Sequence, residues 1–200
     1  WIKKNNFDLA QCHFLEHEIG ENLGEFYKTN LEQAFALCEN SKCSYGCVHG
    51  ISIYILDSKE DPDYSIEICK LVKDNVIRYQ CYHGIGHAIV HIYGEDFGKA
   101  TAICRKLGDR SELCFDGVVH EIIIQKEYKF STPEVLFEEC KNAPDERIRE
   151  TCYLGVGLYL PYFKDRNFSL AAQECYSIQG DDKKFCIMGI GMSSSINENM

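Results

Sequence analysis

Five short amphipathic segments recur along the chain, and each of them ends in a cysteine. Their apolar residues return with helical periodicity among good helix formers, and Thr132-Pro133 before one segment suits a helix N-terminus. The pattern therefore predicts five helices, which read LEQAFALC to Cys38, DYSIEIC to Cys69, FGKATAIC to Cys104, PEVLFEEC to Cys140 and SLAAQEC to Cys175.

A more apolar segment follows each of these helices and begins with its own cysteine. All five read Cys, apolar, variable, Gly, Ile or Val, small or Val, variable: CVHGISI, CYHGIGH, CFDGVVH, CYLGVGL and CIMGIGM. Successive leading cysteines are 34, 33, 38 and 34 residues apart, and 8 to 11 mostly polar residues separate the two cysteines of a unit. This spacing predicts a unit of helix, turn and helix, close in period to tetratricopeptide-type hairpins.

Disulfides are the expected state of the cysteines. There are twelve, an even number, with no C-x-x-C pair of the zinc-ribbon or thioredoxin type and no haem-attachment motif. A disulfide framework predicts a location outside the reducing cytosol. Within each unit a disulfide should join the first helix to the second. Each one should stabilise the fold by about 2 to 3 kcal/mol, because it constrains the unfolded chain. The predicted pairs are Cys38 to Cys47, Cys69 to Cys81, Cys104 to Cys114, Cys140 to Cys152 and Cys175 to Cys186.

Two cysteines, Cys12 and Cys43, are left over by this scheme. If they pair, they tie the first helix of the chain to the first unit. The alternative, Cys38 with Cys43 and Cys12 with Cys47, stays open at this point.

A glycine stands three residues after each leading cysteine. Inside a helix a glycine costs about 1 kcal/mol relative to alanine. Because the cost recurs five times, we expect a close helix crossing at this position.

On its period, paired cysteines and small residues, the chain resembles the tetratricopeptide-like α-solenoids, above all the secreted cysteine-rich proteins whose hairpins each carry one disulfide. The resemblance covers residues 31–192, although the Leu-Gly-x-x-Tyr signature is only partly present, as in YLGVGLYL. It implies an all-α fold, a right-handed superhelix of about five helix-turn-helix repeats of 33–38 residues, used for binding. A fold resemblance assigns no chemistry.

Length and charge narrow the class of protein. Two hundred residues with 45% hydrophobic and 26% charged content predict one globular domain. We expect it over residues 7–192, between an N-terminal flank (1–6) and a polar C-terminal tail (193–200). The net charge of −10 argues against nucleic acid or an anionic membrane surface as the main partner.

No apolar run approaches the roughly 20 residues that span a bilayer, so no membrane-spanning helix is expected. Other features of the sequence are typical of exported proteins. The chain starts at Trp1, which indicates a processed form, and WIKKNN is typical of a segment beside a membrane anchor or a removed signal, or of an ordinary polar terminus. The sequon Asn167-Phe168-Ser169 is compatible with export. We expect an extracytoplasmic protein, secreted, periplasmic or at the cell surface.

Two positions in each second helix are not fixed by the template, namely those two and six residues after the leading cysteine. They lie one turn apart on one face. Six of the seven histidines occupy this stripe or the matching i, i+4 pair near the N-terminus, and the seventh, His91, lies one turn further on. In chain order the stripe holds His13 and His17, His49 and Ile53, His83 and His87, Asp116 and His120, Leu154 and Leu158, Met188 and Met192.

Imidazoles at i, i+4 can bind one Zn²⁺ or Cu²⁺ ion, and neighbouring helices are close enough to supply further ligands. We expect His83 and His87 as the first two ligands, completed by His49 or by His120 and Asp116. The N-terminal pair, His13 and His17, joins them if its helix folds over, or forms a second site with His49. Glu16, Glu18 and Glu121 are candidates to orient the ligands.

The histidines have a second interpretation, because leucines and methionines fill the same positions later in the chain. Histidines on a semi-buried helix face are commonly packing groups. The alternative function is therefore an interaction scaffold or accessory subunit of an extracellular or membrane-associated complex, without metal. Catalysis at an open metal position ranks third, since H-E-x-x-H, G-x-S-x-G, P-loop and dinucleotide motifs are absent, and no nucleotide, haem or flavin signature is present.

Overall fold

The structure, a computed structural model, describes residues 9–39, 43, 45–94, 96–127, 133–143 and 145–198. Within these ranges all regular secondary structure is helical, which confirms the predicted all-α class. The helices are α1 (Leu9–Phe26), α2 (Leu31–Cys38), α3 (Gly46–Lys59), α4 (Pro62–Leu71), α5 (Asn75–Tyr93), α6 (Phe97–Cys104), the 3-10 helix η2 (Arg105–Arg110), α7 (Ser111–Glu127), α8 (Pro133–Lys141), α9 (Glu146–Phe163), α10 (Phe168–Tyr176) and α11 (Lys183–Glu198).

Short polar side chains start several of these helices. Asp61 accepts hydrogen bonds from the first free backbone N–H groups of α4, and Asp74 does the same for α5. Asp96, Asp145 and Asn167 cap α6, α9 and α10. Each cap satisfies donors that have no partner inside the helix. The helix expected to begin at Pro133 begins there as α8, whereas Thr132 lies outside the described residues.

Disulfides join a short helix to the longer helix that follows it. The paired Cα atoms are 5.3 to 5.7 Å apart, and the pairs are Cys38–Cys47, Cys69–Cys81, Cys104–Cys114, Cys140–Cys152 and Cys175–Cys186. The sixth bridge, Cys12–Cys43, ties α1 to the segment before α3. These are the pairs that the cysteine spacing predicts, and the alternative connectivity at the N-terminal end does not occur.

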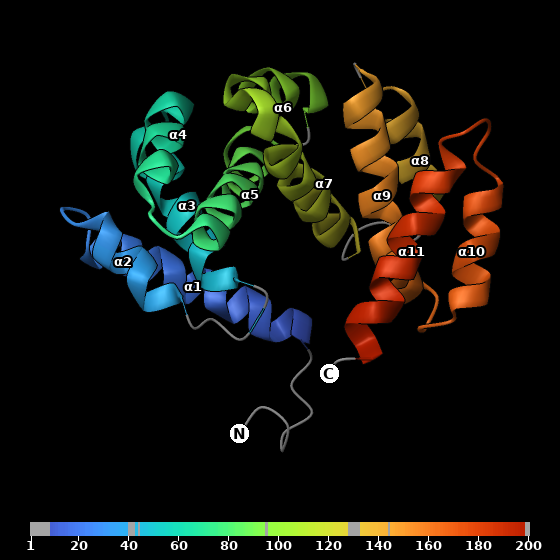
Figure 1. The fold of residues 1–200 in the computed structure, drawn as a ribbon, viewed down its shortest axis with the longest axis horizontal. Helices are drawn as coiled ribbons and strands as arrows, with labels where there is room; N and C mark the ends of the chain where they lie inside the picture. The colour runs from blue at the N-terminus through green and yellow to red at the C-terminus, as the bar shows by residue number, and fades with distance from the viewer. Residues whose placement is uncertain are drawn as a thin grey trace.

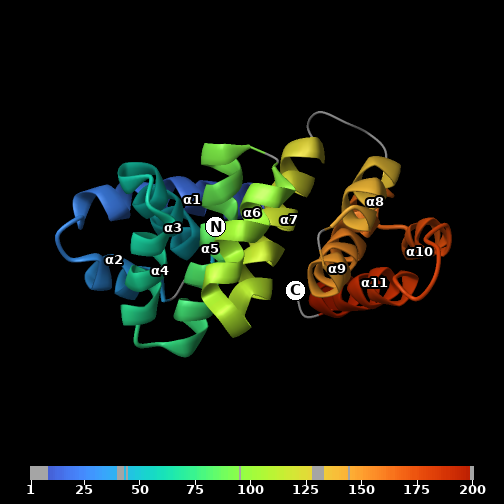
Figure 2. The same cartoon turned by 90° about the horizontal axis from the view of Figure 1, so that it is seen from above.

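The longer helices pack against one another in sequence: α1 on α3, α3 on α5, α5 on α7, α7 on α9 and α9 on α11. In Figure 1, α3, α5, α7, α9 and α11 follow chain order from left to right, and α1, in blue, runs beneath α3 and α5. Figure 2 shows the same order from above. Fully buried side chains such as Ile51, Ile85, Phe115 and Leu160 belong to these longer helices, so the core runs along the stack.

The predicted close crossings occur at the glycines three residues after the leading cysteines. A Cβ at Gly50 would overlap the backbone carbonyl oxygen of His17 in α1, and one at Gly117 would overlap that of His83 in α5. A Cβ at Gly189 would likewise overlap the carbonyl oxygen of Leu154, whereas at Gly84 or Gly155 the nearest atoms are side-chain atoms of Ser52 or Val119 at 2.8 Å. The first crossing brings His17 towards α3, and the second brings His83 towards α7, so the glycines determine how closely the histidine-bearing helices approach.

The C-terminal boundary differs from the expectation of a polar tail over residues 193–200. Helix α11 continues to Glu198, and Ser193 is buried, so the described part of this segment, residues 193–198, belongs to the last helix. The expected N-terminal flank, residues 1–6, lies outside the described residues. Among the described helices, none is sufficiently long and apolar to span a membrane.

Candidate metal centre

Six histidine side chains from four helices gather in one buried cluster. The centroids of neighbouring rings are 4.5 to 6.1 Å apart, and every ring lies against several others. We call this set the histidine cluster; its members are His13 and His17 of α1, His49 of α3, His83 and His87 of α5, and His120 of α7.

The cluster follows from helix periodicity and from the glycine crossings together. The i, i+4 spacing puts His13 and His17 on one face of α1, and His83 and His87 on one face of α5. Close approach of α1 to α3 and of α5 to α7 then places these faces beside His49 and His120. The helix crossings therefore convert a stripe in the sequence into a three-dimensional cluster.

Most of the cluster is shielded from solvent. His87 is 0% exposed, His49 is 2% exposed, and His13 and His17 are each 5% exposed. The other two, His83 and His120, are partly buried. Polar rings in such a site require partners, because an unsatisfied buried polar group is costly.

Oxygen acceptors around the cluster hold one nitrogen of several rings. His87 Nδ1 lies 2.6 Å from Oε2 of Glu121, which is itself 2% exposed. His83 Nδ1 lies 3.1 Å from Oδ2 of Asp116. Carboxylate oxygens only accept hydrogen bonds, so His87 Nδ1 donates to Glu121, and Nε2 of the neutral His87 ring keeps a free lone pair.

Neutral acceptors hold two further rings in the same manner. His13 Nδ1 donates to the backbone carbonyl oxygen of Cys43 over 2.8 Å. His49 Nε2 donates to Oε1 of Gln80 over 2.9 Å. The lone pairs of these two neutral rings are therefore on His13 Nε2 and His49 Nδ1.

The opposite nitrogens face one another inside the cluster. His13 Nε2 is 3.0 Å from His17 Nε2, and His83 Nε2 is 3.3 Å from His120 Nδ1. Two ligands at 2.0 to 2.1 Å from a tetrahedral ion would be about 3.3 Å apart, so these separations fit ligands of a common ion. Without metal, His17 Nε2 donates to the lone pair of His13 Nε2.

Two inward nitrogens, His49 Nδ1 and His87 Nε2, are buried without a hydrogen-bond partner among the described residues. The nitrogens fall into two groups, each with its ligand atoms within 4.8 Å of one another: His13, His17, His49 and His87, and His83, His87 and His120. The arrangement can hold a metal ion in either group.

Burial keeps most of these rings neutral. Desolvation lowers the pKa of His17 to about 3, and it is also the main cause that lowers the pKa of His13. Desolvation places the pKa of His49, His87 and His120 well below the ordinary value of 6.5, and the neighbouring histidines reinforce the effect. At neutral pH these rings are unprotonated, as metal ligands must be.

Glu121 also contacts the seventh histidine. His91 Nε2 lies 3.1 Å from Oε1 of Glu121, and this hydrogen bond is the main cause that raises the pKa of His91. The carboxylate thus connects His87 inside the cluster to His91, which is 44% exposed in its side chain.

The expected ligands do come together, with one difference of role. Asp116 contacts the outer nitrogen of His83 and is not among the grouped ligand atoms, so it orients His83. His13 and His17 reach the cluster because α1 folds against α3. Among the proposed orienting carboxylates, Glu121 contacts a ligand, Glu16 raises the pKa of His13 through its charge, and Glu18 is exposed.

Three neighbours of the cluster have no signal in the cysteine template. They are Gln80, the carbonyl group of Cys43, and Tyr159 of α9, whose ring stacks on His120 with centroids 4.6 Å apart. Gln80 directly precedes Cys81, and only the distance to His49 in space reveals its role. A third group of ligand-type residues, Cys12, Glu16 and Cys43, is not a metal site because its two cysteines form a disulfide.

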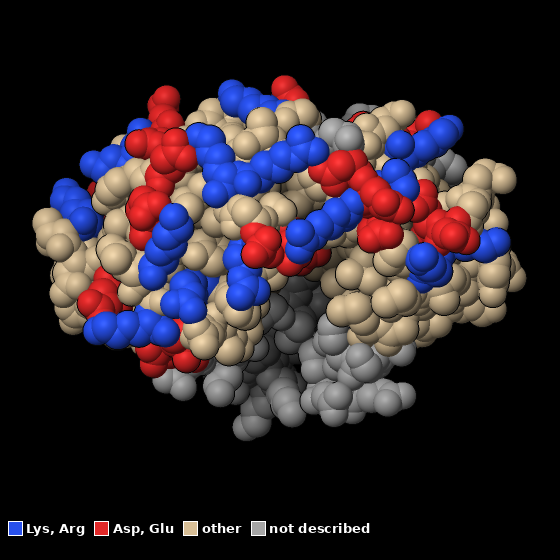
Figure 3. All heavy atoms as spheres, turned by 45° about the horizontal axis from the view of Figure 1, so that its top comes forward, with Lys and Arg blue, Asp and Glu red and all other residues tan. Residues whose placement is uncertain are grey.

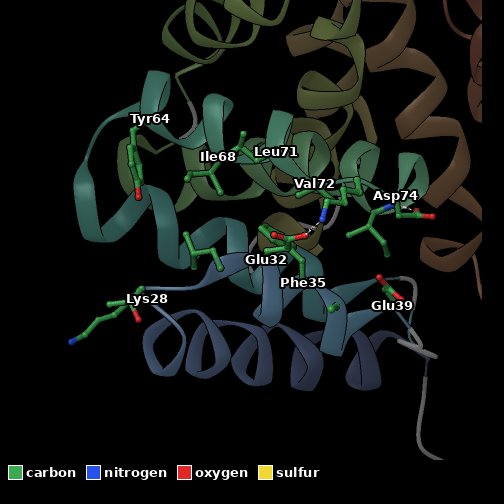
Figure 4. Close-up of a pocket in the computed structure, with 14 residues that line it drawn as sticks. Lys28, Glu32, Phe35, Glu39, Tyr64, Ile68, Leu71, Val72 and Asp74 are labelled. Atoms are coloured by element: carbon green, nitrogen blue, oxygen red, sulfur yellow. Dashed lines mark hydrogen bonds and ion pairs between the residues drawn. The ribbon is translucent and has the colours of Figure 1, made fainter.

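One groove on the surface was compared with the histidine cluster as a candidate binding site. A groove of about 290 Å³ between α2 and α4 contains the ion pair of Lys73 with Glu32 and is otherwise lined largely by apolar side chains such as Phe35, Ile68 and Leu71 (Figure 4). No histidine lines it. On the face shown in Figure 3, acidic and basic side chains are interspersed.

Comparison of the chain with protein-family models, with curated proteins and with solved structures found no match. The geometry of the histidine cluster is therefore the observation that bears on function.

Proposed function

We propose that this protein binds a transition metal, zinc or copper, through the histidine cluster. One observation carries the proposal: three rings, those of His13, His49 and His87, donate an outer N–H to a fixed oxygen acceptor and turn their lone pairs inward. Hydrogen bonding of the far ring nitrogen is how metal-ligating histidines are usually oriented. Packing alone does not require three independent acceptors on the outside of one cluster.

The ligand type selects the metal. Mg²⁺ and Ca²⁺ prefer carboxylate, carbonyl and water oxygens, whereas imidazole suits zinc and copper. In the two groups that contain histidines, every ligand atom is an imidazole nitrogen. Because burial already keeps most of these rings unprotonated, binding at neutral pH requires little proton release.

The proposal also includes the location and the repeat architecture of the protein. Six disulfides fit an oxidising compartment, so we place the protein outside the cytosol, where a protein partner or membrane-associated complex is accessible. The disulfide-linked helix pairs act as five repeats of a right-handed superhelix of the tetratricopeptide-like kind. Metal bound between α1, α3, α5 and α7 would also brace the first repeats against one another.

Elemental analysis tests the proposal directly. Protein purified without chelator, loaded with zinc or copper and passed through a desalting column should retain metal. A double variant, His83→Ala with His87→Ala, should lose much of it. The matched control is His91→Ala, which removes a histidine of the same helix that faces Glu121 from outside the cluster. If the loaded wild-type protein retains no metal, the histidines serve packing and the scaffold function replaces this proposal.

A further inference from the structure

We infer that the histidine cluster is a dinuclear centre, which holds two metal ions side by side. The inference rests on the proposed function, because it concerns how many ions the same residues bind. It starts from a count of ligand atoms: six rings meet, whereas a tetrahedral ion takes four ligands. The four-histidine group around His49 does not include His83 or His120. A single ion in that group leaves His83 and His120 without an ion.

His87 decides how the ligands divide between two ions. It belongs to both groups, yet its Nδ1 is engaged with Glu121 and only Nε2 faces the cluster. A neutral imidazole with one free lone pair binds one ion. Assigning His87 to its helix neighbour His83 gives each ion three histidines. The first trio is His13, His17 and His49, and the second trio is His83, His87 and His120.

The internal geometry of each trio suits one ion. In the first trio the ring centroids are 4.5, 5.1 and 5.6 Å apart. In the second they are 4.9, 5.5 and 4.9 Å apart. Each trio also contains one of the two close nitrogen pairs, His13 with His17 and His83 with His120. The rings of the two trios are therefore about equally close to one another, and each trio is compact enough for one ion.

No layer of protein separates the two trios. The ring of His49 lies 4.8 Å from that of His83 and 4.9 Å from that of His87, and His17 lies 5.1 Å from His87. These distances between the trios equal those within them. Two ions held there would be on the order of 4 Å apart, the spacing of two-metal sites in proteins.

Charge predicts what completes the coordination. An imidazole that binds a metal is neutral, and the carboxylates that contact cluster rings are Asp116 and Glu121. Two divalent ions bring more positive charge than these two carboxylates offset. Each ion with three histidines also keeps an open fourth position. A small anion such as hydroxide, shared between the ions, satisfies both conditions.

Copper titration with two readouts tests this inference. The metal-free protein is loaded with Cu²⁺, the bound copper is measured by elemental analysis, and the electron paramagnetic resonance spectrum is recorded on the same sample. We expect two equivalents of copper per chain. At a spacing of about 4 Å the two spins interact, so the spectrum should show a spin count well below the copper content or a half-field transition.

Paired variants assign the two sites. His13→Ala with His17→Ala should leave one copper and the spectrum of an isolated ion, and His83→Ala with His120→Ala should do the same. Saturation of the wild-type protein at one equivalent would overturn the dinuclear centre and leave the proposed function intact. Two equivalents with the full spin count of isolated ions would overturn the side-by-side arrangement. No bound copper or zinc at all would overturn both proposals. The wild-type measurement decides the matter even if a variant does not fold.

Discussion

The carboxylate of Glu121 accepts a hydrogen bond from Nδ1 of His87 over 2.6 Å, and both side chains are almost completely buried. The contact fixes the tautomer of His87 and directs Nε2 into the histidine cluster. It also places a carboxylate directly behind a ligand, which increases the basicity of the imidazole. Glu121 is therefore the residue outside the ligand set whose loss should weaken metal binding most clearly.

Replacement of Glu121 by alanine should raise the Kd for Zn²⁺ about 10- to 100-fold, the usual effect of removing such a partner. Glu121→Gln should fall between the wild type and Glu121→Ala, since the amide oxygen can still accept from His87 but carries no charge. Competition titration against a chromophoric chelator measures these constants. The control is Glu67→Gln, which removes an exposed carboxylate paired with Lys70. Equal affinity in all four proteins would show that Glu121 does not orient a ligand.

The disulfide between Cys12 and Cys43 should matter for metal binding as well as for folding. It anchors α1, which carries His13 and His17, and the carbonyl group of Cys43 holds His13. The double variant Cys12→Ser with Cys43→Ser should therefore bind less metal than the wild type in elemental analysis.

A second disulfide provides the control. The bridge from Cys175 to Cys186 joins α10 to α11, and neither helix supplies a histidine to the cluster. Its double serine variant should be destabilised by about 2 to 4 kcal/mol, the usual range for a lost disulfide, yet keep its full metal content while folded. Equal metal loss in both variants would contradict a specific role for the N-terminal bridge.

Glycines at matching template positions should respond differently to alanine. A Cβ at Gly86 would overlap the carbonyl oxygen of Cys114, whereas at Gly191, in the last helix, it would meet no atom within 4 Å. Gly86→Ala should destabilise by about 1 to 3 kcal/mol, because helices α5 and α7 must separate. Gly191→Ala should be neutral or stabilise by up to about 1 kcal/mol. Denaturant unfolding measures both, and equal effects would contradict the close crossing.

Acid should destabilise the metal-free protein below about pH 6.5. The unfolded chain takes up protons on its histidines near that pH, whereas burial keeps the folded pKa values lower, at about 3 for His17. The unfolded state then binds more protons, so the stabilisation is full above pH 6.5 and is lost as the pH falls towards the folded values. The histidines with lowered pKa are His13, His17, His49, His87 and His120.

The size of the effect is set by linkage. Each such histidine contributes up to about 1.4 kcal/mol per pH unit between its folded and unfolded pKa values. His91 acts in the opposite direction: its raised pKa gives a contribution that is full below pH 6.5 and is lost as the pH rises through the folded value. Urea unfolding at pH 7.5 and pH 5 should show the net loss in acid. Unchanged stability over this range would contradict buried neutral histidines.

The sequence predicts the helix pairs and their disulfides because both depend on spacing along the chain. The distance from Cys69 to Cys81 allows a turn between two helices, and the recurring glycine at Gly50 or Gly117 indicates a close crossing. The same template isolates His83 and His87 as residues that the fold does not require. Periodicity also puts each histidine pair on one helix face, so most of the candidate site follows from local rules.

The rest depends on contacts between distant segments. The acceptor for His13 is a backbone carbonyl at Cys43, and no side-chain pattern marks a carbonyl. Gln80 and Tyr159 look like ordinary helix residues until α3 and α7 are packed against them. Asp116 shares the template position of His83, which suggests a ligand, yet it contacts the outer nitrogen of His83. Orientation in space separates the two roles.

X-ray absorption at the metal edge of the zinc- or copper-loaded wild-type protein tests the central claim most directly. Metal bound by the histidine cluster predicts nitrogen or oxygen neighbours at about 2.0 to 2.1 Å and the multiple-scattering pattern of several imidazole rings. A spectrum without imidazole scattering, or one dominated by sulfur at about 2.3 Å, would contradict binding by the cluster.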